Sequence, residues 1–101
     1  MKLNLQQRIS LLGYLPKEWK FETLVILKDI IKKIEITQDE IAKYEIKSEG
    51  NNILWNVEGV KSELELEFTE LETSEIKKAL KKASDDERLR MEDLPLYEFF
   101  V

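Results

Sequence analysis

The stretch from Glu63 to Ala83, ELELEFTELETSEIKKALKKA, is the clearest guide to the architecture because its hydrophobic spacing changes halfway along. Leu64, Leu66 and Phe68 alternate with glutamates, the period-2 pattern of a strand with one buried face. Beyond them the period becomes helical, with one apolar face made of Ile76, Ala79, Leu80 and Ala83. A strand that passes directly into a helix predicts a mixed fold in which both elements cover a single core.

Two capping boxes indicate where helices begin. Thr69 is followed three residues later by Glu72, so the threonine side chain can accept from the glutamate amide while the glutamate reaches back. Thr37 and Glu40 repeat this spacing. The two pairs predict helices that start immediately after Thr69 and Thr37.

The remaining segments complete an α+β pattern. Helices are expected over Leu3–Leu12 and Trp19–Ile34, and the broad apolar surface of the second makes it the expected central core helix. Two strands, Glu45–Lys47 and Ile53–Val57, flank a turn-rich segment, and a short helix is expected at the C-terminal end. We predict a single domain over residues 1–101. Its small three-stranded, mostly antiparallel sheet is packed by helices, in the order helix-helix-helix-strand-strand-strand-helix-helix.

The residue types present exclude several classes of chemistry. The chain contains no histidine and no cysteine, so it has no disulfide, no thiolate metal site and no histidine general base. The sequence predicts no catalytic residue, no cofactor and no metal ligand, and it favours a non-enzymatic protein. A small-ligand or nucleotide site formed between protomers, using glutamate, lysine and tyrosine, is an open alternative.

The sequence shows no targeting or membrane segment. Residues Met1–Arg8 are polar and amphipathic, and no apolar run approaches the roughly 18 residues of a membrane span. We expect a cytoplasmic protein with no membrane contact.

Charge is unevenly spread along this acidic chain, whose net charge is −5. Residues 37–76 hold three basic and eleven acidic residues, a local net charge of −8, which disfavours contact with a phosphate backbone. One route to DNA stays open, because residues 40–48 resemble the first half of a helix-turn-helix and the strands after them could form a wing. The recognition helix of such a regulator would have to include Glu49–Asn52, which are poor helix formers.

Two aromatic segments are candidates for partner binding. Core packing is the default expectation for both tryptophans, but Trp19, at a helix start between charged residues, has a stronger case for exposure than Trp55, which alternates with apolar neighbours in a strand. Large apolar side chains also crowd the C-terminal octet: Leu96, Tyr97, Phe99 and Phe100. They either seal this domain's own core or bury against a second copy or another protein.

A basic stripe lies opposite the apolar face of the helix that follows Thr69. It consists of Lys77, Lys78, Lys81 and Lys82. A solvated lysine face is the simple interpretation, and docking of an acidic partner through Lys77 and Lys81 is the functional one. Pairing of the stripe with the glutamate row of a second copy would make the protein a homo-oligomer.

Several fragments resemble small uncharacterised bacteriophage and prophage proteins of about this length. They are Leu15–Glu18, Thr23–Leu24, Trp55–Asn56, Glu67–Thr69, Ala79–Lys82 and Leu96–Phe99. The resemblance implies a phage accessory protein in the host bacterial cytoplasm, such as a modulator of a host process, and it implies no active site. The leading hypothesis is therefore a protein that acts by binding another protein. A winged-helix-like DNA-binding regulator is the first alternative.

Overall fold

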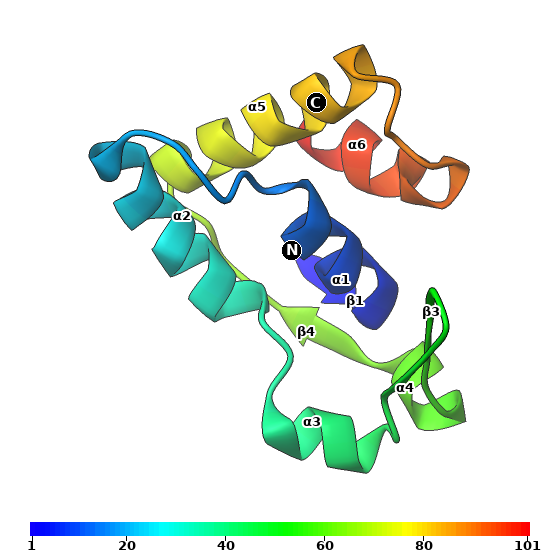
Figure 1. Cartoon of the computed structure of the whole chain (residues 1–101). Coiled ribbons are helices and arrows are strands. Elements are labelled where there is room, and N and C mark those ends of the chain that lie inside the picture. Colours follow the sequence, from blue (N-terminus) through cyan, green and yellow to red (C-terminus); the bar gives the residue numbers. More distant parts are fainter.

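The computed structural model describes all residues from Met1 to Val101 and has an α+β fold (Figure 1). In chain order its elements are β1 (Lys2–Asn4), α1 (Leu5–Tyr14), α2 (Phe21–Ile34), α3 (Gln38–Lys43), β2 (Lys47–Glu49), β3 (Asn52–Leu54), α4 (Val57–Lys61), β4 (Glu63–Glu65), α5 (Glu70–Asp85), a 3-10 turn (Met91–Asp93) and α6 (Leu94–Phe100). No helix is both long enough and apolar enough to cross a membrane.

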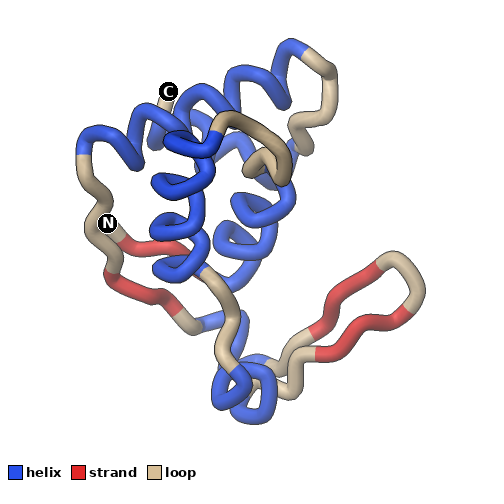
Figure 2. Tube along the Cα trace, turned by 60° about the vertical axis from the view of Figure 1, so that its left-hand side comes forward, coloured by secondary structure: helices blue, strands red, loops and turns tan.

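The predicted three-stranded sheet is wrong, because the strands form two separate antiparallel pairs. β1 pairs with β4, placing Leu3 opposite Leu64, and β2 pairs with β3. The helix expected from Leu3 starts two residues later, since Asn4 has extended backbone and its side chain caps the amide of Gln7. The preceding residues are then free to pair with β4. The β2–β3 hairpin projects from the body and does not reach that pair (Figure 2).

The core lies between α1, α2, α5 and α6, with β1 and β4 along one side (Figure 1). The apolar face predicted for α5 is confirmed, because Ile76, Ala79, Leu80 and Ala83 are all buried. Helix α2 is confirmed as a helix but buries only one stripe, through Leu27, Ile30 and Ile34. Phe21, on its first turn, is 78% exposed. The helix thus flanks the core and is not surrounded by it.

Two charged side chains join the helices. Arg8 of α1 is buried and its guanidinium forms two hydrogen bonds with the Glu40 carboxylate, of 2.6 and 2.9 Å. It also donates to the carbonyl oxygens of Ile34 and Glu35 at the end of α2. On the other side of the core, Lys33 of α2 contacts the carboxylate of Glu72 at 2.6 Å. Both predicted capping boxes are present, so Glu40 and Glu72 each cap a helix and bind a cation from another one.

Two further predictions at the middle of the chain need correction. Trp55 is half-buried and lies just beyond β3, not in the core. The strand expected to run to Val57 ends at Leu54, because the Asn56 side chain accepts from the Gly59 amide and starts the short helix α4.

Candidate functional site

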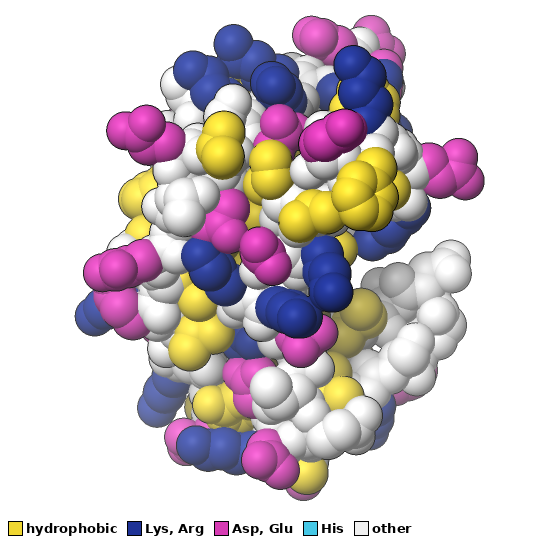
Figure 3. Space-filling view, turned by 90° about the vertical axis from the view of Figure 1, so that its left-hand side faces the viewer, with side chains coloured by type: hydrophobic (Ala, Val, Ile, Leu, Met, Phe, Trp, Pro, Cys, Tyr) yellow, Lys and Arg dark blue, Asp and Glu magenta, His cyan; other side chains and the backbone are white.

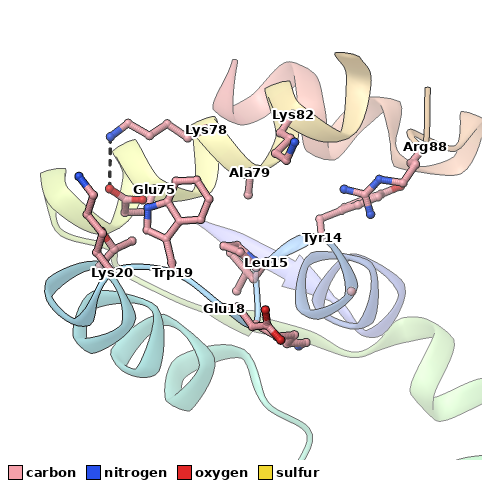
Figure 4. Close-up of a pocket in the computed structure, with 14 residues that line it drawn as sticks. Tyr14, Leu15, Glu18, Trp19, Lys20, Glu75, Lys78, Ala79, Lys82 and Arg88 are labelled. Carbon is pink, nitrogen blue, oxygen red and sulfur yellow. Dashed lines mark hydrogen bonds and ion pairs between the residues drawn. The ribbon is translucent and has the colours of Figure 1, made fainter. Parts of the chain in front are cut away.

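The most substantial hollow is a groove of about 660 Å³ between the α1–α2 connection and α5 (Figure 4). Helix α1 ends at Tyr14 and the chain continues in extended conformation at Leu15, followed by Pro16, which cannot prolong the helix. The connection then passes beside α5 until α2 begins at Phe21. Buried Leu15 and Ala79 face each other across the groove floor, where the small alanine leaves space.

Trp19 supplies the main apolar wall of this groove. Its side chain is 58% exposed, and it lies beside Lys20 and opposite Glu75 and Lys78 of α5 (Figure 4). A tryptophan that is not needed by the core and sits on a hollow is a typical anchor for a bound partner. The residue singled out from the sequence thus lies at the best-formed site.

The groove is positively charged although the protein is negatively charged. Two acidic side chains, Glu18 and Glu75, line it together with five basic ones: Lys17, Lys20, Lys78, Lys82 and Arg88. Lys78 pairs with Glu75 at 3.4 Å and Lys82 with Asp86 at 3.3 Å. Because these lysines are exposed, their ion pairs are weak and a bound anion can compete for them.

The lysine stripe on α5 is divided by the helix geometry. Lys78 and Lys82 line the groove, whereas the predicted contact residues Lys77 and Lys81 lie outside it. Residues four apart share a helix face, so the stripe consists of two adjacent rows. Ala79 and Ala83 directly follow Lys78 and Lys82 in the sequence. Small residues at these positions are the sequence signal that another segment packs closely on the side of α5 that carries Lys78 and Lys82.

The large apolar residues of the C-terminal octet are also divided, and they do not line the groove. Leu96 and Phe100 are buried in the domain's own core, and Tyr97 is half-buried. Phe99 is 64% exposed and stacks edge-on against Phe100, with the ring centroids 5.4 Å apart. Phe99 borders a separate, shallower hollow of about 400 Å³ that shares no lining residue with the Trp19 groove.

Tyr14 lies at one end of the groove and is held there by a hydrogen bond to Asp93, which could not be predicted from the sequence. Its hydroxyl donates to the buried Asp93 carboxylate at 2.5 Å and accepts from the Arg90 amide at 3.2 Å. Burial, followed by the bond to Asp93, raises the pKa of the Tyr14 phenol. The phenol therefore stays neutral with its proton engaged, which makes Tyr14 part of the wall and not a reactive group.

Two other hollows on the molecule are smaller, about 400 and 220 Å³. On the face shown in Figure 3, hydrophobic side chains are scattered among lysines and carboxylates and do not gather into one broad patch. No group of three or more histidine, cysteine, aspartate or glutamate side chains has a geometry that could hold a metal ion. An exposed indole with exposed ammonium groups around it is suited to bind a ligand that is both anionic and partly apolar.

Comparisons with protein families, with curated proteins and with solved structures give no match for this chain. The resemblance to phage proteins accordingly stays a prediction, and the case for the Trp19 groove as a binding site rests on its geometry alone.

Proposed function

We propose that this protein is a non-enzymatic binding protein that accepts an acidic segment of another protein in the Trp19 groove. The observation that carries the proposal is the exposed indole at the edge of a basic groove in an otherwise acidic molecule. Its place of action is the cytoplasm, as the sequence leads us to expect.

An extended acidic peptide matches the chemistry of the groove. Lys20, Lys78 and Lys82 lie on its opposite walls, so carboxylates along a strand-like segment meet a cation on either side. An apolar side chain of the same segment fits between Trp19 and the floor. Binding of this kind requires no catalytic group.

The DNA-binding alternative receives little support from the middle of the chain. Residues that a recognition helix would need form the β2–β3 hairpin. Helix α3 before it has only six residues, and Asp39 and Glu40 lie in its first turn. Acidic groups in that position repel a phosphate backbone.

The test uses two matched variants of α5. Lys78→Gln/Lys82→Gln removes the groove row, and Lys77→Gln/Lys81→Gln removes the same charge from the neighbouring row at the same spacing. Binding of a panel of ten-residue glutamate-rich peptides, each with one leucine or phenylalanine, is measured by titration calorimetry. We expect the groove variant to weaken binding about tenfold and the control variant to change it less than twofold at moderate salt.

Trp19 provides an independent reading of the same event. In a Trp55→Phe background, Trp19 is the sole tryptophan, so its emission should shift to shorter wavelength when the peptide covers it. Equal weakening in both lysine variants, or binding without a change in emission, would contradict the groove proposal. Tighter binding of nucleotides than of any acidic peptide would favour the small-ligand alternative.

A further inference from the structure

The β2–β3 hairpin stands apart from the packed body of the molecule. All residues of β2 and β3 are exposed, and the hairpin extends away from the helices (Figure 2). Its tip is a two-residue turn, in which Gly50 adopts a positive φ of 63° that suits glycine. An isolated two-stranded hairpin is only marginally stable in water, so this element would gain from an additional strand.

The pairing register shows which backbone groups are free. Glu49 and Asn52 close the two-residue turn, and such a closing pair exchanges both of its hydrogen bonds. Because these pairs alternate with unbonded ones, Ser48, opposite Ile53, directs its N–H and C=O outward from the β2 edge. No backbone or side-chain hydrogen bond from outside the hairpin reaches Ser48. The edge is therefore open to another strand.

The charges on β2 are self-complementary. The strand reads Lys47-Ser48-Glu49, and an antiparallel copy centred on Ser48 would bring each Lys47 opposite the Glu49 of the other copy. Centring the pair on Lys47 or Glu49 instead would oppose like charges. The β3 edge has no such charge complementarity, since an antiparallel pair of β3 strands centred on Ile53 would place uncharged Asn52 opposite Leu54.

We propose that β2 pairs antiparallel with β2 of a second copy of this chain, about a two-fold axis at Ser48. The two Ser48 residues would exchange both N–H···O bonds. The Lys47–Glu49 pairs would then occupy unbonded positions, where side chains of facing residues lie closest. The product is a four-stranded sheet in the order β3–β2–β2–β3. None of these residues lines the Trp19 groove, so the proposal is independent of the proposed function.

The contact is small, and we expect a weak, reversible dimer. Three-residue strands bury much less surface than the roughly 1,200–2,000 Å² of stable complexes. Sedimentation velocity from about 10 μM to 1 mM, at low ionic strength, should show a sedimentation coefficient that increases with concentration. A single monomer species over that whole range would overturn the proposal.

Charge reversal supplies the specific test. Lys47→Glu makes the edge wholly acidic and Glu49→Lys makes it wholly basic, so each variant alone should associate about tenfold more weakly than wild type. An equimolar mixture of the two variants should associate again, and so should the double variant Lys47→Glu/Glu49→Lys. If the mixture stays monomeric, or either single variant dimerises like wild type, the β2 interface is excluded.

Two further variants separate edge pairing from general effects. Ser48→Pro removes the outward N–H while sparing the hydrogen bonds inside the hairpin, so it should abolish the dimer. Lys61→Glu changes the same charge at an exposed position of α4 and should leave the dimer intact. Because the hairpin lies outside the core, circular dichroism should show unchanged helix content in every variant. A dimer that survives Ser48→Pro would contradict backbone pairing.

Discussion

Arg8 is the single residue whose position was least predictable from sequence. It is a charged residue within the helix predicted over Leu3–Leu12, yet its side chain is almost completely buried. Two segments converge on its guanidinium, which donates to the carbonyl oxygens at the end of α2 and to the carboxylate that caps α3. The cost of burying a charge is repaid by ion pairing and hydrogen bonds, and for Arg8 these partners are brought together only by the tertiary structure. The capping box of Glu40, by contrast, could be predicted from the sequence because Thr37 and Glu40 are only three residues apart.

The Arg8–Glu40 contact predicts a pH dependence of stability. Hydrogen bonds from Arg8, followed by the amide and hydroxyl of Thr37 and the Arg8 charge, lower the pKa of Glu40 to about 2, against the opposing effect of burial. Because the folded-state pKa is depressed, the stabilisation is complete above pH 4.5 and is lost as the pH falls towards 2. We expect Glu40→Gln to lower the free energy of unfolding by about 2–3 kcal/mol at pH 7.

Urea denaturation at pH 7 and at pH 2.5 measures this contribution. The difference between wild type and Glu40→Gln should shrink markedly at the lower pH. Glu35→Gln is the matched control, since that carboxylate is exposed and forms no ion pair. An equal loss of stability in both variants at pH 7 would mean that the buried contact contributes little.

Two glycines predict opposite results from the same substitution. A Cβ at Gly59 would lie 2.8 Å from a Trp55 ring carbon and 3.1 Å from Leu5, so Gly59→Ala should destabilise the protein by about 1–3 kcal/mol. A Cβ at Gly13 would meet nothing within 4 Å, and this residue is helical, so Gly13→Ala should stabilise by about 0.5–1 kcal/mol. Thermal unfolding measures both. A stabilising Gly59→Ala would show that α4 can move away from α1 without cost.

At the scale of elements, the sequence predicts the helices better than the sheets. Helix α5 could be read from its own residues, because the capping box and the apolar face agree. Strand partners depend on distant segments. β4 pairs with β1, which precedes it by some sixty residues. The alternating pattern of β4 predicts a strand but does not indicate which other strand it pairs with. The hairpin was placed near its true position by its turn residues, but its separation from the body had no local signal.

Helix α6 gives a prediction that separates core packing from partner binding. Leu96 is 1% exposed, so Leu96→Ala should cost about 2–4 kcal/mol of stability through lost burial and the cavity left behind. Phe99→Ala should cost less than about 1 kcal/mol, because this ring is mainly exposed and only edges Phe100. Chemical denaturation compares the two. Equal losses would indicate that Phe99 packs more tightly than its exposure implies.

At the scale of the whole molecule, the chain divides into a well-packed and a loosely packed part. The core cluster draws on residues 3–34 and 66–100, whereas the middle of the chain contributes only the buried Gly59. Composition and periodicity suggested one core but could not show that the middle third would lie beside it. That third also carries much of the acidic block, and within this third ion pairs with the body reach only Glu40, from Arg8, and Glu65, from the N-terminal amine. Weak packing and like charge together favour local opening there.

Hydrogen exchange should expose this division. Amides at the buried positions of α2 and α5 should exchange only through global unfolding, which for a domain of ordinary stability means protection of roughly 10⁴-fold or more. Amides of β2 and β3 should exchange within about tenfold of an unstructured peptide at low micromolar concentration, where the proposed dimer is dissociated. Protection of the hairpin equal to that of α5 would refute the division. Protection of the Ser48 amide that increases with protein concentration, while protection in α5 stays unchanged, would support self-association through β2. The reason is that no acceptor within its own chain binds the Ser48 amide, so a second strand is needed to protect it.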